Sequence, residues 1–538
     1  MGIIDTLIGN TTYLILLILL IVYIPLYFYV RSSQGMRDRG IVPYGPFIMI
    51  KTTRGMRLLD GLAKYKRFWG FFGAASKIMA LFLMAFITFI MIMNLRIIPT
   101  AFNSPGIGIE YALAIPGLNP MLPFWYALLG LIIAVVIHEL AHGVQTRANN
   151  MKVESMGILH CVVPMGAFVE PNDEQIRNTS RKARSTVFAA GIAINLTVAI
   201  VLFLVMSVGL MGSMSSPVGD RAAVMNITAG SPAFDSGMDP SSVILQVREE
   251  GTTVWQDVYY SDNVFYDGGD MKTPFVFSLN KIYDIHYATK DGPENFAKAY
   301  MGVFIESVVK ESPAGRADIQ PKSFIVSING EDVTSLRSFT EILSRQTPNS
   351  APVDVVVQKY NGKDQPLGAP ETHSIIFDDN NGNAFLGVTR TFSGFNLTTP
   401  DAVLAAAKNP FSNVKSVPDV ALSALMYIGQ PFQGKSPIQQ QVMWWYDSSI
   451  MSDDTFNVVL QAVFWIFWLN LVLAIMNALP AVPFDGGYLF RDGVGKIVDR
   501  THRNSTAEKR EKIVNATTNM MSYAMIFILM LVMVAVIF

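Results

Sequence analysis

The chain has 538 residues, of which 51% are apolar and only 15% are charged. This composition argues against an ordinary soluble protein of several domains and favours insertion into a membrane. The net charge of −1 gives no basic surplus, so nucleic acid is not expected as a partner. The single cysteine, Cys161, excludes an intramolecular disulfide.

Six apolar stretches are long enough to cross a bilayer, which takes about 17–25 residues each. They lie near residues 12–30, 78–98, 122–145, 185–210, 456–479 and 516–538. The first stretch lacks a basic leading region and a small-residue cleavage site, and Arg31 follows it, so we expect a retained span. The predicted fold class is therefore a polytopic α-helical membrane protein with about six spans.

Lysine and arginine are unevenly distributed among the segments that connect these stretches. Nine lie between residues 31 and 67, six between 147 and 184, and seven between 491 and 512, whereas the segment 99–121 contains none. The positive-inside rule assigns the three basic segments to the cytoplasm and both termini to the outside. We therefore expect a multi-pass protein of the cell membrane, with membrane lipid around its spans.

The third apolar stretch ends in IIAVVIHELAHG, in which His138 and His142 are four residues apart. On a helix these imidazoles share one face, with Glu139 beside them. This H-E-x-x-H pattern can supply two zinc ligands and a carboxylate that takes a proton from a zinc-bound water, whose pKa falls to about 7. Ionisable residues at membrane depth are costly and typically functional. Solvated histidines at the end of a juxtamembrane helix are the alternative.

The segment VESMGILHCVVPMGAFVE, residues 153–170, is too short to span the membrane but apolar enough to enter it. We predict a re-entrant hairpin that turns between Pro164 and Gly166. His160, within the hairpin, is expected to have a structural role.

The long segment 211–455 between the fourth and fifth stretches is predicted to be water-soluble and extracytoplasmic. SPAGRADIQPKSFIVSINGEDV, residues 312–333, resembles a PDZ domain of membrane-associated proteases, although Lys322-Ser323 stands where Gly-Asp is usual. A diverged copy precedes it at 227–247. We expect PDZ-like α+β domains at 211–298 and 299–370, and an exterior linker, or an interfacial helix, over 371–455. The resemblance implies that the loop from Tyr300 through Gly302 to Val303 receives an exposed peptide terminus; a spacer without a ligand is the alternative.

A catalytic zinc ion usually takes three protein ligands, so a third donor is expected. Asp485 is the candidate, because it follows the fifth stretch at the same predicted depth as both histidines. Pro480 and Pro483 would end the helix before it. Gly486 and the glycine after it would permit a tight turn that aims the carboxylate sideways from irregular backbone.

The motifs HELAH (138–142) and NALPAVPFDG (477–486) together resemble those of the site-2 proteases, in an archaeal-like form with a PDZ insertion. The resemblance covers about 122–210 and 456–500 and, less tightly, the two N-terminal spans. We expect two parts of a catalytic core at 122–210 and 456–538, preceded by a two-span region at 1–121. It implies a Zn²⁺ site and the following residues: His138, His142 and Asp485 as ligands, Glu139 as general base, and Asn477 near the substrate or the developing oxyanion. It also implies that the hairpin lies beside the active site, where an exposed strand edge could pair with an unwound substrate and satisfy backbone groups released from the substrate helix. Gly166 and Asn195 would lie on the substrate side, although Asn195 equally fits a hydrogen bond between packed helices.

The sequence therefore predicts an intramembrane zinc metalloprotease that cleaves single-span membrane proteins within or near the membrane, with its active site near the cytoplasmic side. A zinc transporter is one alternative, but it would place donors at several depths, whereas these histidines cluster at one. An inactive PDZ scaffold is another, which the intact motifs disfavour.

Overall fold

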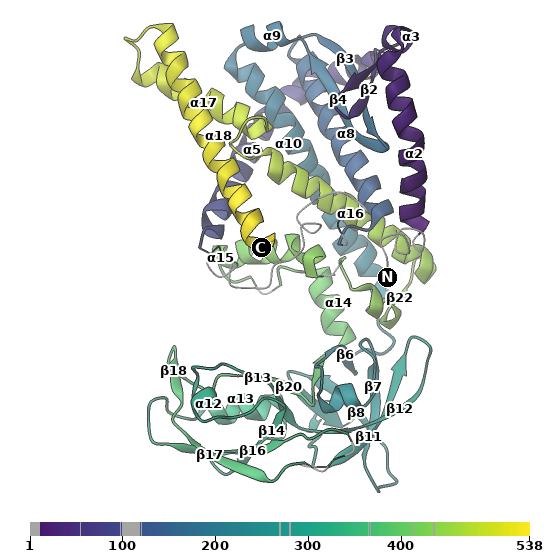
Figure 1. The fold of residues 1–538 in the computed structure, drawn as a ribbon, viewed down its shortest axis with the longest axis vertical. Helices are drawn as coiled ribbons and strands as arrows, with labels where there is room; N and C mark the ends of the chain where they lie inside the picture. Colours follow the sequence, from purple (N-terminus) through teal and green to yellow (C-terminus); the bar gives the residue numbers. More distant parts are fainter. Residues whose placement is uncertain are drawn as a thin grey trace. The chain divides into compact units, whose positions relative to one another are not determined.

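A computed structural model of the protein describes residues 11–53, 55–96, 98, 119, 121–267, 271–278, 281–363, 365, 367–412, 414–433 and 436–537. The chain divides into two compact units (Figure 1). The helical unit comprises Met1–Leu210, Ser416–Pro437 and Asn457–Phe538, and the β unit comprises Met211–Lys415 and Ile438–Phe456.

Five helices among the described residues are long and apolar enough to cross a membrane. They are α5 (Lys66–Asn94), α8 (Phe124–Ala148), α10 (Arg181–Leu204) with its continuation through η1 (Val205–Leu210) and η2 (Met211–Ser213), α16 (Asp453–Asn477) and α18 (Ala507–Ile537). These helices coincide with five of the six predicted stretches. The first stretch forms α2 (Thr11–Ser32), whose described apolar part, Leu17–Ser32, is shorter. Residues 99–118 of the predicted exterior loop lie outside the described residues.

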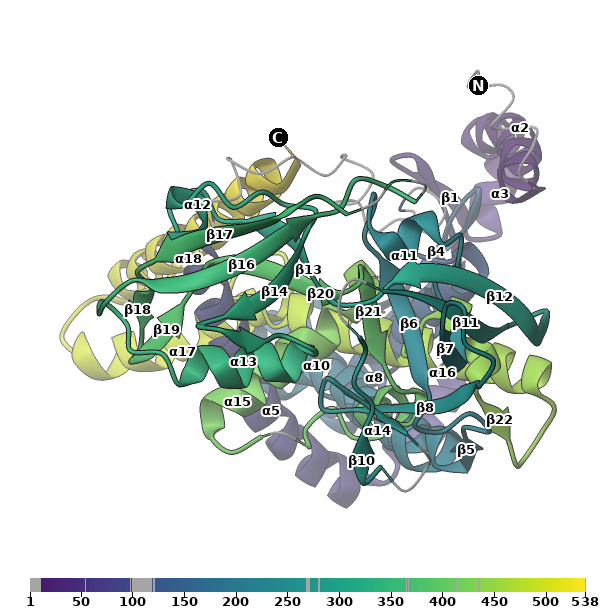
Figure 2. The same ribbon diagram turned by 90° about the horizontal axis from the view of Figure 1, so that it is seen from below.

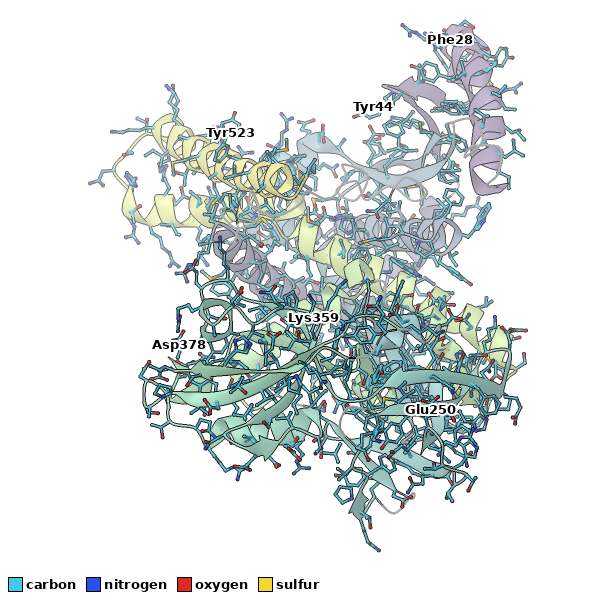
Figure 3. The ribbon with its side chains drawn as sticks, turned by 60° about the horizontal axis from the view of Figure 1, so that its bottom comes forward. Phe28, Tyr44, Glu250, Lys359, Asp378 and Tyr523 are labelled. Carbon is cyan, nitrogen blue, oxygen red and sulfur yellow. The ribbon has the colours of Figure 1, made fainter. Side chains whose placement is uncertain are left out.

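The outward faces of these helices suit a lipid environment. On α5, residues at helical spacing such as Ala80, Leu83 and Ile87 are buried in a core shared with α10 and α16, whereas Ile78 and Phe82 are 72% and 67% exposed. Phe28 on α2 and Tyr523 on α18, 60% and 71% exposed, are further outward-facing examples (Figure 3). Apolar side chains on such a surface favour lipid, because lipid, unlike water, imposes no hydrophobic cost on them.

Short helices complete the helical unit. They are α3 (Gln34–Asp38), α4 (Met56–Ala63), α9 (Asp173–Asn178), α15 (Val417–Ile428), η3 (Gln430–Gln433) and α17 (Asp485–Thr501). Of these, α17 is the helix that begins at Asp485, the third candidate zinc ligand.

A four-stranded antiparallel sheet lies in the helical unit, with strand order β1-β2-β3-β4. Its strands are β1 (Ile41–Tyr44), β2 (Phe47–Thr52), β3 (Val153–Cys161) and β4 (Val163–Pro171). The predicted hairpin is present as β3 and β4, but the predicted turn at Pro164 to Gly166 is wrong. The turn is at Val162, which has a φ of 61°, and Pro164 pairs with His160. Proline lacks an N–H, which the outer strand of a sheet tolerates.

Helix α2 is attached to this sheet through tyrosine hydroxyls. Tyr23 donates to the carbonyl oxygens of Pro46 and His160, at 2.8 and 3.1 Å, and Tyr27 donates to that of Gly45 at 2.7 Å. The ring of Tyr23 also stacks on that of His160, with centroids 5.9 Å apart. His160 therefore helps to hold the β3–β4 hairpin against α2, which is a structural role.

The first half of the β unit is built on antiparallel strands. Its elements are β5 (Met214–Ser215), β6 (Ala222–Ile227), α11 (Pro232–Asp235), β7 (Val243–Glu249), β8 (Gln256–Ser261), β9 (Val264–Asp267), β10 (Thr273–Pro274), β11 (Ile282–Thr289) and β12 (Gly292–Tyr300). Their core includes Phe265 and Phe277 and is completed by Phe392 and Phe395 from the end of the second half. Shared aromatic residues therefore tie the two halves together.

The second half continues the same sheet, and its strand order can be followed in Figure 2. Its elements are β13 (Val303–Val308), α12 (Pro313–Arg316), β14 (Ser323–Ile328), β15 (Glu331–Asp332), α13 (Leu336–Ser344), β16 (Val353–Lys359), β17 (Pro370–Ile375), β18 (Asp378–Asn380), β19 (Asn383–Phe385), β20 (Val388–Phe392) and β21 (Phe395–Thr398). Further along the chain come α14 (Pro400–Lys408), η4 (Gln440–Trp445) and β22 (Asp447–Ser448). Figure 3 labels Lys359 and Asp378 in this half and Glu250 in the first.

The two halves repeat one local structure where the sequence repeats Ser-Pro-Ala. Ser231 caps α11 and Ser312 caps α12, each by accepting a backbone N–H three residues later. Ten residues after each serine, Ser241 and Lys322 have φ values of 76° and 62°. Lys322 thus takes the left-handed backbone for which the usual glycine is suited.

The predicted boundary at residue 370 is wrong. β17 begins at Pro370 and pairs with β16, and the sheet continues through β20 to β21. Residues 416–437, with α15, belong to the helical unit. The linker predicted over 371–455 is therefore partly sheet, because strands that pair only with distant partners give weak local signals.

Candidate active site

Three predicted ligands converge on one point in the helical unit. The Nε2 atoms of His138 and His142, both on α8, lie 3.1 Å apart, and each is 3.1 Å from Oδ2 of Asp485. The tetrahedral ligands of a zinc ion, at 2.0–2.1 Å from the metal, would be about 3.3 Å apart. Two imidazoles and a carboxylate in this arrangement therefore fit a zinc ion.

The Nδ1 atoms of both imidazoles face residues of α10. Nδ1 of His142 donates to the carbonyl oxygen of Val187 at 2.8 Å, so its Nε2 is left for a metal. Nδ1 of His138 lies 3.4 Å from the amide nitrogen of Asn195, whose Oδ1 has no partner among the described residues. A half-turn of the amide would give that oxygen an N–H from His138, the hydrogen bond that a metal-bound His138 needs.

Gly191 allows α10 to approach the site. A Cβ atom there would lie 2.5 Å from Nε2 of His142 and 2.6 Å from Cε1 of His138. Glycine is needed for this close contact between helix and ligands, not for its backbone freedom.

The carboxylate of Glu139 is held by the sheet. Its Oε2 accepts a hydrogen bond from the backbone N–H of Val169 in β4, at 3.1 Å. That N–H points away from β3, so the outer edge of β4 faces Glu139. The chain thus places a strand edge and an acid–base group next to the two histidines.

The structure brings Asp485 to the histidines by a different route from the one predicted. Asp485 is the first residue of α17 rather than part of an irregular turn. A Cβ at Gly486 would lie 2.3 Å from the carbonyl oxygen of Ala478, and one at Gly487 would lie 2.4 Å from the backbone of Ala481. The two glycines therefore serve close packing of α17 against the segment after α16, and the predicted tight turn is wrong.

A cavity of about 1060 Å³ opens at this point. Its walls include His138, Glu139, His142, Asn477 and Asp485, together with Val169 of β4. Nδ2 of Asn477 donates to the carbonyl oxygen of Leu473 at 3.1 Å, which leaves its second amide hydrogen for another acceptor.

The remaining predicted residues do not line the cavity. Asn195 is fully buried behind His138, Gly166 pairs with Leu159 in the hairpin, and Tyr300 and Gly302 belong to the β unit. The backbone N–H of Gly302 donates to Oγ of Ser393. Their roles in substrate binding stay predictions.

The sequence reasoning missed an ion pair that joins α10 to α17. Asp492 is 6% exposed and accepts hydrogen bonds from Arg184, whose Nε lies 3.1 Å from both carboxylate oxygens, and from Oγ of Ser185. α10 carries the contacts behind the histidines, and α17 begins at the third ligand. The pair therefore fixes the two halves of the metal site relative to each other.

Asp492→Ala is expected to lower the free energy of unfolding by about 1–3 kcal/mol, because it takes the buried charged partner away from the Arg184 guanidinium, whose side chain is only 21% exposed. Thermal unfolding in detergent would measure the change. Asp499→Ala is the matched control: Asp499 also pairs with an arginine on α10, Arg181, but it is 42% exposed. Its loss should cost less than about 1 kcal/mol. Equal destabilisation by both variants would refute a special role for the buried pair.

A comparison with known proteins identifies the family to which the chain belongs. The family model of peptidase family M50 matches residues 126–530. The chain belongs to peptidase family M50, the site-2 proteases. The match includes His138 and His142 on α8 as well as Asp485 on α17.

Two curated relatives are similar to parts of this M50 chain. An uncharacterized protein of Methanocaldococcus jannaschii is 30% identical over 191 residues, which is 35% of this chain and 49% of the relative. A Clostridium acetobutylicum protein with the name "putative zinc metalloprotease" is 25% identical over 159 residues, 25% of this chain and 45% of the relative. The chain thus matches about half the length of each relative.

Proposed function

We propose that this M50 protein is an intramembrane zinc metalloprotease that cleaves single-span membrane proteins within or near the membrane, in regulated intramembrane proteolysis. The observation that carries the proposal is the convergence of His138, His142 and Asp485 at 3.1 Å on the wall of a cavity that Glu139 also lines. The five apolar helices support action on substrates that lie in lipid.

His138, His142 and Asp485 would hold the zinc ion. When bound, it supplies a Lewis acid that polarises the scissile carbonyl and makes water nucleophilic at neutral pH. Glu139 takes the proton from the attacking water as the new C–O bond forms, and then gives it to the amine nitrogen as the C–N bond breaks. The free amide hydrogen of Asn477 donates to the oxygen on which negative charge develops.

We infer that the substrate binds at the outer edge of β4. β4 pairs with β3 on one side, and its Val169 N–H faces Glu139 on the other. An extended substrate segment that pairs with this edge would satisfy its backbone groups and lie beside the general base. Cleavage by this arrangement therefore requires local unwinding of the substrate helix.

The distribution of lysine and arginine supports an active site near the cytoplasmic side and a β unit outside the membrane. Lipid and the substrate span are then its partners in the membrane. The β unit would meet the exterior part of a substrate and its exposed peptide termini.

A zinc transporter is less well supported. Among the described residues, one group of three or more His, Cys, Asp or Glu side chains could hold a metal ion, and it is His138, His142 and Asp485. A carrier would need further donor groups along its path.

The test of the proposal is zinc content and cleavage of a model single-span substrate, measured on the same purified protein in detergent. We expect about one zinc ion per chain, loss of cleavage after chelation and its return with added zinc. Protein that retains zinc but cleaves no single-span substrate would favour the inactive scaffold, and protein without zinc affinity would refute the proposal.

Asn477→Ala is expected to lower kcat by about 10²–10³-fold, because an oxyanion donor is lost. KM and zinc content should change little. Asn470→Ala is the matched control, since Asn470 lies two turns earlier on α16 and its Nδ2 also donates to a carbonyl one turn back. An unchanged kcat in Asn477→Ala would remove this residue from the reaction.

A further inference from the structure

Two strands in the second half of the β unit begin with the same motif. Residues 299–303, AYMGV, lead into β13, and residues 384–388, AFLGV, lead into β20. The edges of these strands differ. β13 pairs with β14 on one side and with β20 on the other. β20 pairs with β13 along its length but with β21 only at Phe392. Of the two strands, β20 therefore has the edge that can accept an added strand.

Helix α13 contacts β20 and runs beside it (Figures 1 and 2). Arg390, the third residue of β20, pairs with Ile305 of β13 and shares its face of the sheet. The guanidinium lies 4.3 Å from the centroid of the Phe339 ring on α13, and its Nη2 donates to Oγ1 of Thr340 at 2.9 Å. The Arg390 side chain thus lies between β20 and α13.

Arg390 lacks a counter-ion. Within the part of the chain that the structure describes, no carboxylate forms an ion pair with it, and its Nε is buried without an acceptor. Burial lowers the pKa of Arg390, since the charged guanidinium loses hydration there. An arginine side chain stays protonated at neutral pH, so a partly desolvated cation with an unused N–H donor lies between β20 and α13. Burial of such a charged group costs free energy unless an anion pairs with it.

We propose that the free edge of β20, beside α13, binds an extended peptide whose Asp or Glu side chain pairs with Arg390. The peptide would add to the free edge of β20, and its carboxylate would accept from Nε and a second guanidinium nitrogen. An acidic side chain fits better than a chain terminus, because Arg390 lies in the middle of the strand. This proposal goes beyond the proteolytic function and does not depend on it.

The test is selection from a library of random octapeptides, presented with free or amidated C-termini, on the purified full-length protein in detergent. The variants are Arg390→Gln and, as a control in the same half, Arg345→Gln, whose arginine is 60% exposed and paired with Glu331. We expect acidic residues to be enriched at one position by wild type and by Arg345→Gln, for free and amidated peptides alike. Arg390→Gln should lose this enrichment and bind the selected peptides at least about tenfold more weakly.

The melting temperature of each variant separates binding from folding. Removal of an uncompensated charge should leave the melting temperature of Arg390→Gln unchanged or higher. If this variant is unfolded, Arg390→Lys keeps the charge without the forked donors and should retain the acidic preference at reduced affinity. The proposal is overturned by the absence of peptide binding, by acidic enrichment that persists in Arg390→Gln, or by selection that requires a free C-terminus but no acidic side chain.

Discussion

Glu139→Gln is expected to reduce cleavage by about 10²–10⁴-fold, the range that general acid–base catalysis typically contributes, while each chain still binds one zinc ion. Glutamine keeps the size of the side chain but cannot take a proton from water at neutral pH. Because Glu139 accepts a hydrogen bond from the Val169 N–H and does not belong to the group formed by His138, His142 and Asp485, its neutralisation should leave the metal ligands in place.

Zinc content and single-turnover cleavage of a model single-span substrate would be measured side by side for wild type and Glu139→Gln. Glu174→Gln is a suitable control, because Glu174 is an exposed residue of α9. Retention of most activity by Glu139→Gln would assign the base to another residue. Loss of zinc from this variant would instead mean that the carboxylate belongs to the metal site.

Asp485→Asn is expected to weaken zinc binding by more than about 100-fold. Mutation of residues that merely support metal ligands typically costs 10–100-fold, and Asp485 is placed to bind the metal directly. The neutral amide also leaves the site without the negative charge that lies 3.1 Å from both histidines. Competition with a chelator of known affinity would give the change.

Asp499→Asn is the control for this experiment, since it lies on the same helix about 21 Å further along its axis, at 1.5 Å per residue. It should keep the zinc affinity of wild type. A fully loaded Asp485→Asn protein that resists the chelator would place the third ligand elsewhere and contradict the arrangement described here.

Local sequence pattern was sufficient to locate the parts of the metal site. The four-residue spacing of His138 and His142 gives a shared helical face whatever surrounds it, and prolines 480 and 483 end a helix wherever they stand. The apolar lengths of α5, α8, α10, α16 and α18 and the alternating residues of β13 and β14 are equally local properties. Such features depend on neighbours within a few residues, so the chain specifies them directly.

Other features depend on residues that lie far apart in the chain. The pairing of Arg184 with Asp492 joins positions 308 residues apart, and the basic N-terminal segment contributes β1 and β2 to a sheet whose other strands follow residue 152. Likewise, the pairing of β13 on both edges moves the free strand edge to β20. Neither periodicity nor turn chemistry encodes these contacts, because they form only when packing of the whole unit brings distant segments together. The sequence motifs thus name the candidate metal ligands, and the folding of α17 against α10 brings the Asp485 carboxylate within 3.1 Å of both histidines.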